Sequence, residues 1–389
     1  MTVDHEEVMW ARLLLLGSRQ PSSDELVRAY RVLARVGPRA YAPKLVAALI
    51  KRWYEIGDPR TTEGLAAEAV RVARAVEGEA PKGTRDLHWA LKVHQKSLYA
   101  LGRRAEGRAT CEELAEAGDV LPLAVVLAEE GRFREAAALE EEAARDLGPG
   151  RVYPGSVRLP ANLEVAGLHE EAAAAFRALL EAIRSEADEG RTARTALVWV
   201  SVHLARMRDS VGDGAGAEAA RREALDVLGE LAAGAGPRPW AGDPDWWKAL
   251  FLLSGRAAEP VASPDSPMPS LDAAYPGSHE VKDAFLAALP ALEARAAVLR
   301  EAGRLPELID VWRRIGVRVA FRDVHRRRPY EEGLAPYFDE GVALARALPG
   351  DPARLARALT DRSMFLVAAG SFGPAHADLA EAAGLLRAD

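Results

Sequence analysis

Several short runs in this chain carry residue types that bind cofactors or metals in other proteins. The run Gly212 to Ala217 matches the spacing of a dinucleotide-binding loop. Such a loop must follow a β-strand, whereas this run joins two segments with helical periodicity. The run His169-Glu170-Glu171 lacks the second histidine, four positions from the first, that a zinc-binding helix requires. Neither run therefore predicts a cofactor or a metal site.

The other reactive side chains are isolated in the sequence. His88 and His94 are six positions apart, so they would point to opposite sides of a helix. The single cysteine, Cys111, can form neither an internal disulfide nor a multi-thiolate metal site, and we expect it to pack inside a helix pair. Phosphate-binding and nucleophile-elbow motifs do not occur. We expect no cofactor and favour a non-catalytic function, although distant segments could still assemble an acid–base pair.

Lysine is the charged residue type that is concentrated in this sequence. The chain has 44 arginines but only seven lysines. Four lysines form two pairs at helical spacing, which are Lys44 with Lys51 and Lys92 with Lys96. The aromatic residues interleaved with them are Tyr54, Trp89 and Tyr99. A surface of this composition suits an acidic peptide or a terminal carboxylate. The alternative is that the lysines only solvate helix faces while the aromatic residues pack between helices.

The elements that must position these residues are expected to be helical. The composition is 49% hydrophobic but only 6% aromatic, and Ala and Leu, which favour helix over strand, supply much of the apolar content. With 389 residues the chain is long for one compact core, which leaves two domains or an elongated repeat array. We therefore predict an all-α protein.

The charge and hydropathy of the chain indicate which partners and which cellular compartment to expect. A net charge of −7 argues against nucleic-acid binding, and the short basic run from His325 to Arg328 is typical of a solvated helix end. The apolar run Leu13 to Leu16 is far shorter than the ~20 residues that a membrane-spanning helix needs. The acidic N-terminal segment and the single cysteine favour the cytoplasm. We expect no nucleic-acid partner, no membrane association and a cytoplasmic location.

A repeated pattern supports the helical prediction. A glycine followed five positions later by a small or apolar residue is typical of two antiparallel helices joined by a tight turn. The pairs are Gly102/Gly107, Gly131/Ala136, Gly167/Ala172, Gly212/Ala217, Gly303/Leu308 and Gly370/Ala375, with Gly57 fitting a longer turn and Gly17 fitting loosely. Helix starts are predicted at Ser22 with Glu25, at Asp243-Pro244 and at Asp351-Pro352. In the segment 129–147, the glutamates are expected on the solvated face of the second helix.

These units resemble tetratricopeptide repeats. The resemblance rests on GRFREAAALEEEA at 131–143, GLHEEAAAAFRALL at 167–180, GRLPELIDVWRRI at 303–315 and GSFGPAHADLAEAA at 370–383. It covers about residues 40–233 and 279–387, and the repeats are of the long, degenerate kind common in bacteria. It implies a right-handed superhelical array of antiparallel helix hairpins, an α-solenoid, with a concave peptide-binding groove. The positions that would line the groove are Lys44, Lys51, Tyr54, Trp89, Lys92, Lys96, Tyr99, Trp199 and Arg206.

Residues 234–278 interrupt the repeats. Proline is too frequent there for a continuous helix, apart from a short one around WWKALFLLSGR. We therefore expect an N-terminal lobe over 1–233, a Trp/Pro-rich insertion or hinge over 234–278 and a C-terminal lobe over 279–389. Trp240, Trp246 and Trp247 either cover the open end of a helical lobe, which we favour, or form a ligand platform.

The sequence favours a non-catalytic scaffold or adaptor that binds a peptide or protein, with acidic groups preferred, in a basic and aromatic groove. A second hypothesis is a regulatory sensor that binds a small molecule or a signal peptide and controls a separate effector protein. A third hypothesis is a helical enzyme with residues 234–278 as a lid. A deep cavity under that segment, lined by carboxylates or histidines, would favour the enzyme. The sequence does not indicate an oligomeric state.

Overall fold

The computed structural model of the chain describes residues 4–77, 85–147, 152, 154–189, 194–234, 245–270, 278–322 and 330–387. Within these ranges the regular elements are helices, and the strand-like pairing is limited to an isolated bridge between Ser263 and Ser266. The prediction of an all-α fold is confirmed. None of the described helices combines the length and the apolar character that crossing a bilayer requires.

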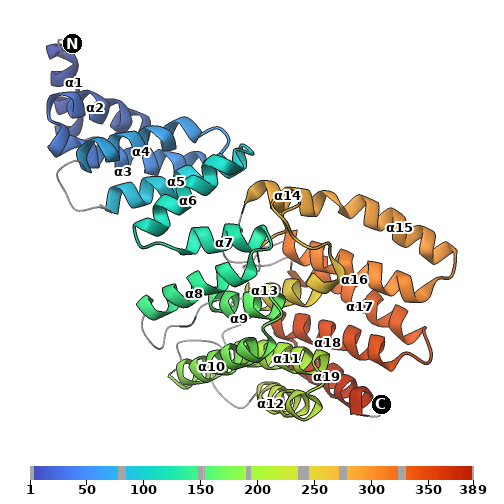
Figure 1. The fold of residues 1–389 in the computed structure, drawn as a ribbon. Coiled ribbons are helices and arrows are strands. Elements are labelled where there is room, and N and C mark those ends of the chain that lie inside the picture. Colours follow the sequence, from blue (N-terminus) through green and yellow to red (C-terminus); the bar gives the residue numbers. More distant parts are fainter. Residues whose placement is uncertain are drawn as a thin grey trace. The chain divides into compact units, whose positions relative to one another are not determined.

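Internal packing divides the chain into two units. Unit 1 comprises residues 1–126 with 278–280, and unit 2 comprises residues 127–277 with 281–389. In each unit, helices that are neighbours along the chain pack against each other (Figure 1). The three segments expected from the sequence, 1–233, 234–278 and 279–389, follow the repeat pattern instead of the packing, and they stay a prediction.

Unit 1 is a row of helical hairpins. Its helices are α1 His5–Leu16, α2 Ser23–Val36, α3 Pro38–Ile56, α4 Glu63–Glu77, α5 Arg85–Ala100, α6 Arg104–Glu116 and the first part of α7 Leu121–Glu129. The helix α2 begins at the predicted capping box, in which the Glu25 amide donates to Ser22 Oγ and the Ser22 amide donates to the Glu25 carboxylate. Besides its sequence neighbours, α3 packs against α5, so the first helices of two successive hairpins lie side by side.

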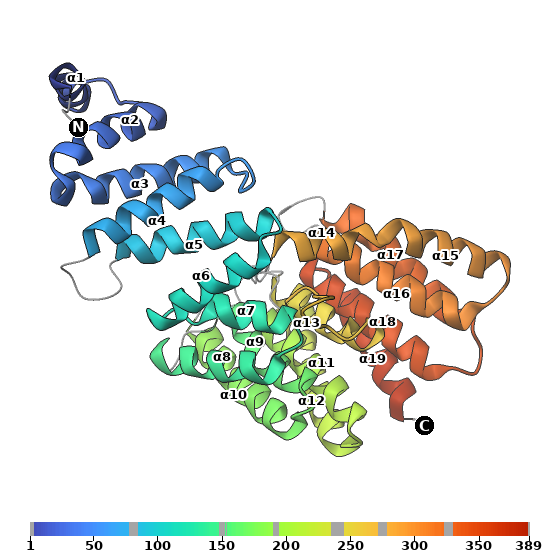
Figure 2. The same ribbon diagram turned by 45° about the horizontal axis from the view of Figure 1, so that its top comes forward.

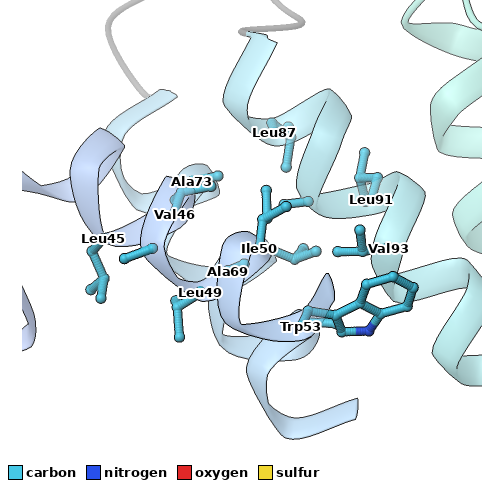
Figure 3. Close-up of a cluster of buried hydrophobic side chains, with 14 of the residues drawn as sticks. Leu45, Val46, Leu49, Ile50, Trp53, Ala69, Ala73, Leu87, Leu91 and Val93 are labelled. Carbon is cyan, nitrogen blue, oxygen red and sulfur yellow. The ribbon is translucent and has the colours of Figure 1, made fainter. Parts of the chain in front are cut away.

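The core of unit 1 lies between α3, α4 and α5. Figure 3 shows Leu49 and Ile50 of α3 and Leu91 of α5 in this cluster, all of which are buried. Small residues such as Ala69 on α4 let the helices approach closely. The indole Nε1 of Trp53 donates to Ser97 Oγ over 2.9 Å. That hydrogen bond satisfies the one polar atom of a large side chain that is otherwise buried among apolar groups.

The predicted turn glycines are confirmed as the points where the hairpins reverse. The φ angle is between 65° and 80° at Gly57, Gly102, Gly131, Gly167, Gly212, Gly303 and Gly370. Only glycine enters this left-handed region without steric cost, so it ends the first helix of each hairpin. The residues five positions later are buried, as predicted, at Gly107, Ala136, Ala172, Ala217, Leu308 and Ala375. Gly17, which fits the pattern loosely, keeps a negative φ.

Unit 2 continues with the remaining helices. They are the end of α7, α8 Phe133–Leu147, α9 Arg158–Val165, α10 His169–Asp188, α11 Thr195–Ser210, α12 Gly214–Ala232, α13 Asp245–Gly255, most of α14 His279–Ala287, α15 Leu289–Glu301, α16 Leu305–Arg322, α17 Tyr330–Arg346, α18 Pro352–Ala368 and α19 Phe372–Arg387, with short 3₁₀ turns at Pro154–Val157 and Arg256–Ala258. Asp351 caps α18 as predicted, because its carboxylate accepts from the Arg354 amide. The predicted start at Asp243-Pro244 lies outside the described residues.

Helix α13 forms the centre of unit 2. It contacts α11, α16 and α18, and α12 also packs against α19 (Figures 1 and 2). The Trp247 ring is fully buried, with its centroid 5.7 Å from that of Phe251 and 5.9 Å from that of Phe365. Trp246 is buried as well. Both tryptophans are therefore core residues and not an exposed ligand platform; that they cover the end of a lobe stays a prediction, and Trp240 lies outside the described residues.

Arginine–glutamate pairs join helices that are two apart in the chain. Arg31 of α2 pairs with Glu68 of α4 over 2.5 Å, and Arg300 of α15 pairs with Glu340 of α17 over 2.6 Å. Similar pairs are Arg74–Glu113, Arg184–Glu223 and Arg346–Glu381. In each pair the two residues are 35 to 40 positions apart. In two of these pairs, Arg31–Glu68 and Arg74–Glu113, the planar guanidinium binds the carboxylate through two donors.

Besides its positive φ, the turn at Gly131 requires a glycine because another segment packs directly on it. The segment after α13 passes over it, and a Cβ atom added to Gly131 would lie 2.2 Å from the carbonyl oxygen of Ala262. The Met268 amide donates to the carbonyl oxygen of Glu129 over 2.9 Å. The 256–270 segment is thus held against the turn between α7 and α8. The two segments approach this closely only because Gly131 has no side chain.

We predict that Gly131→Ala destabilises the protein more than Gly167→Ala does. Both variants put a side chain on a left-handed residue, which costs about 1–2 kcal/mol. A Cβ at Gly167 meets nothing within 4 Å, whereas a Cβ at Gly131 must displace the 256–270 segment. Thermal unfolding followed by circular dichroism measures both variants. Equal losses of stability would contradict the close contact at Ala262.

Candidate functional site

Three of the predicted groove residues lie on one exposed side of α3. Lys44, Lys51 and Tyr54 are all exposed. The Lys44 ammonium lies 5.4 Å from the centroid of the Tyr41 ring. Lys51 Nζ is 3.8 Å from Glu55 Oε1, and both side chains are open to solvent. This helix therefore presents lysines and a tyrosine together, with one carboxylate among them.

Three more predicted residues lie on the neighbouring helix, α5. Trp89 is 45% exposed, and Lys92 and Lys96 are half-buried. Lys92 Nζ lies 2.7 Å from Asp119 Oδ2. Burial, and then repulsion from Lys92, lowers the pKa of the Lys96 ammonium. We call the six residues of the two helices the α3–α5 face; they are Lys44, Lys51, Tyr54, Trp89, Lys92 and Lys96.

The other predicted groove residues need correction. Tyr99 is 2% exposed and packs so closely on α6 that a Cβ added to Gly107 would lie 2.9 Å from its ring. Trp199 is fully buried in unit 2, where its Nε1 donates to the carbonyl oxygen of Met364 over 3.0 Å. Neither residue presents a surface, because a neighbouring helix covers it. Arg206 is half-buried in unit 2 and lines a cavity.

That cavity has a volume of about 780 Å³ and lies at the turn end of the hairpins in unit 2. Its walls come from the turn between α7 and α8, the end of α9, the start of α10, the end of α11 and the segment 256–262. The charged or titratable residues that line it are Arg132, Arg134, Glu135, Glu164, His169, Arg206, Arg256 and Glu259. Apolar lining includes Phe133, Leu253 and Val261. We call it the unit 2 cavity.

One wall of the unit 2 cavity contains a buried histidine–carboxylate pair. His203 Nε2 donates to Glu164 Oε2 over 2.6 Å, and Arg206 Nη2 donates to Glu164 Oε1 over 3.0 Å. Burial would raise the pKa of Glu164, but His203 and Arg206 outweigh burial and lower the pKa to about 2. Burial also lowers the pKa of His203; Glu164 opposes that shift, while Arg206 adds to it. The carboxylate is therefore ionised and the imidazole neutral at neutral pH.

The other carboxylates of the cavity also have arginine partners. Glu259 binds Arg314 over 3.0 Å and Arg318 over 2.5 Å, and these two bonds lower its pKa against the effect of burial. Glu135 pairs with Arg132 one turn away. All three glutamates that line the cavity are thus committed to cations within the protein.

Arg256 is a buried arginine of the cavity. It is 8% exposed, and its guanidinium carbon lies 5.7 Å from the centroid of the Phe133 ring. Nη1 donates to the carbonyl oxygen of Pro269 over 3.2 Å. Burial lowers the pKa of Arg256 to about 10, although Glu259 and Glu129 favour its charged form. The side chain is therefore still protonated at neutral pH.

No pattern in the sequence predicts this cavity. Its first wall belongs to the segment 129–147, whose glutamates were expected to be solvated. Glu140 is instead buried and lies 2.8 Å from Arg158, whose side chain is equally buried. Glu129 and Glu130 are buried as well, so the expectation was wrong for these three residues. Cys111 is buried, as predicted. No cluster of histidine, cysteine, aspartate and glutamate residues that could hold a metal ion occurs in the described ranges.

Comparison with known proteins does not assign the chain to a family. No protein-family model matches it, and no curated protein matches it.

We predict that stability falls as the pH decreases from about 7 to 5, and that His203 contributes to this fall. Because burial lowers the pKa of His203, the unfolded chain binds a proton at a higher pH than the folded protein does. Protonation below about pH 6.5 therefore favours unfolding. In His203→Gln the dependence on pH should be weaker, measured as the unfolding temperature at several pH values. The exposed His169 serves as the matched control, since His169→Gln should keep the dependence of the parent. The same slope in all three proteins would contradict the assignment.

Proposed function

We propose that the protein is a non-catalytic binding protein, built as a right-handed tetratricopeptide-like solenoid, that holds an acidic peptide or protein segment on the α3–α5 face. One observation carries the proposal. Four lysines and two aromatic residues occupy accessible positions on two helices that pack against each other. Their spacing is that of the groove positions of tetratricopeptide repeats.

The chemistry of the α3–α5 face suits such a partner. The ion pair of Lys51 and Glu55 is solvent-exposed, and pairs of this kind contribute only ~0–1 kcal/mol. An incoming carboxylate can replace Glu55 at little cost. The exposed rings of Tyr54 and Trp89 add apolar contact area next to the charges, and these two residue types are enriched among the residues that dominate binding energy at interfaces.

The unit 2 cavity meets part of the criterion for the enzyme hypothesis, because three glutamates and His169 line it, but the pKa values of its carboxylates favour binding. A general acid or base works best with a pKa near the operating pH. Glu164 has a pKa of about 2, and the pKa of Glu259 is lowered as well. Although the segment 256–262 forms one wall, as the hypothesis of an enzyme with a lid expects, these carboxylates are stabilised as anions and are poorly suited to exchange protons at neutral pH.

The cavity also favours the second candidate, a regulatory sensor of a small molecule. Its volume of about 780 Å³ lies within the range of small-molecule sites. A ligand that binds only the folded protein raises the unfolding temperature, and the rise grows with the logarithm of its concentration relative to Kd. A thermal-shift screen therefore separates a sensor from a scaffold that binds peptides alone.

We predict that Lys44→Glu combined with Lys51→Glu weakens binding of a fluorescein-labelled octaglutamate peptide by about tenfold or more, measured by fluorescence anisotropy. The two substitutions replace attraction by repulsion on one side of α3. The control replaces two other exposed cations of unit 1, with Arg71→Glu on α4 and Arg12→Glu on α1. It changes the net charge equally but leaves the six side chains of the face intact. The proposal fails if the peptide does not bind, or if the two double variants lose affinity equally.

A further inference from the structure

We propose that the unit 2 cavity binds a small organic oxyanion, a carboxylate or a phosphate ester, whose charged group is held by Arg256 and Arg134. The inference gives the sensor hypothesis a ligand class. It does not depend on the α3–α5 face, because that face belongs to unit 1 and the cavity to unit 2.

The first support is the incomplete hydrogen bonding of Arg256. Its Nη1 donates to a backbone carbonyl, but Nη2 is buried and has no hydrogen-bond partner among the described residues. A buried donor without an acceptor is unfavourable, and such donors are rare in folded proteins. Nη2 is itself closed to solvent, but Arg256 is among the residues that line the cavity, so a rotation of its guanidinium would let a ligand there supply the acceptor. Oxygen atoms of carboxylates and phosphates fit the two-pronged geometry of arginine.

The second support is the charge balance of the cavity wall. Its three glutamates have arginine partners, and two of these partners, Arg314 and Arg318, do not line the cavity. Arg134 lines the cavity, is exposed and makes no ion pair with the described residues. Glu129 and Glu259 favour the charged form of Arg256, yet neither lies within ion-pair distance of it in the described ranges. The cavity therefore retains positive charge that its own carboxylates do not neutralise.

The third support is the direction of two helices. Phe133, Arg134 and Glu135 form the first turn of α8, and His169 is the first residue of α10; all four line the cavity. Helix N-termini carry partial positive charge and unpaired backbone N–H groups, so both helices favour an anion at the place where the arginines gather.

The size and the apolar lining of the cavity suit an organic anion better than a bare inorganic ion. A volume of about 780 Å³ accommodates a drug-sized molecule. Phe133 and Leu253 are buried residues whose accessible atoms face the cavity, and Val261 adds an exposed apolar wall. A ligand with an apolar body beside its oxyanion would use both parts of the site.

Calorimetric titration of the full chain at constant ionic strength tests the proposal. The probes are phenyl phosphate, benzoate, inorganic phosphate and neutral phenol. We expect phenyl phosphate or benzoate to bind more tightly than inorganic phosphate, and phenol to bind at least tenfold more weakly than the better anion. Binding of phenyl phosphate alone indicates a phosphate ester, and binding of benzoate alone indicates a carboxylate. No binding of either anion at millimolar concentration would overturn the proposal.

Two variants place the binding in the unit 2 cavity. Arg134→Gln and Arg256→Gln should each weaken the bound anion by about tenfold or more, since hydrogen bonds to charged groups are lost. Arg222→Gln, an exposed arginine of α12 outside the cavity, should keep the affinity of the parent. If Arg256→Gln does not fold, Arg134→Gln decides the question, because its side chain is exposed. Parent affinity in Arg134→Gln would overturn the assignment.

Anion binding in the unit 2 cavity is independent of peptide binding on the α3–α5 face. The variant with Lys44→Glu and Lys51→Glu should bind the anion as tightly as the parent does. Loss of peptide binding with retained anion binding would therefore separate the two sites, and failure of one proposal would leave the other standing.

Discussion

Most tight helical hairpins in this chain reverse direction at a residue that enters the left-handed region, and the packing of both units depends on these turns. Ten glycines of the described residues have positive φ, and seven of them are at the turns predicted from the sequence. Each turn sets the start of the second helix, and the residue five positions later then faces the first helix and is buried. At Gly131 the same residue also leaves room for the backbone of Ala262. One glycine thus fixes both a hairpin and a wall of the unit 2 cavity.

Charge is distributed differently on the surface and in the interior. On the surface, arginine–glutamate pairs join helices two apart, where each pair contributes little energy by itself. Inside unit 2, Glu140 with Arg158 and Glu164 with His203 are shielded from water. Removing one partner of a buried pair leaves a charge without compensation, which costs about 3–5 kcal/mol. Of these two carboxylates only Glu164 lines the unit 2 cavity, where Arg206 also binds it, so the proposed binding falls to Arg134 and Arg256.

The hairpins were predictable because their signals are local: a turn glycine, a small residue five positions on and helical periodicity between them. The accessible positions of Lys44, Lys51 and Trp89 follow from the same periodicity. The burial of Tyr99 and Trp199 does not, because it depends on which neighbouring helix covers each residue. The unit 2 cavity requires the 256–262 segment to lie beside a turn that is more than 100 residues earlier in the chain. No local pattern encodes that contact. The spacing of the lysines predicted a binding surface in unit 1. Nothing in the local sequence distinguishes the buried Arg256 from the other arginines.

The spacing of the surface ion pairs has a consequence for how such a chain can change in length. Arg31 and Glu68, or Arg300 and Glu340, are separated by about the length of one hairpin. When a segment of that length is duplicated or deleted, the arginine of one copy meets the glutamate of the next copy. Because the pairs span 35 to 40 positions and lie in solvent, the row tolerates small differences in hairpin length at little cost in stability.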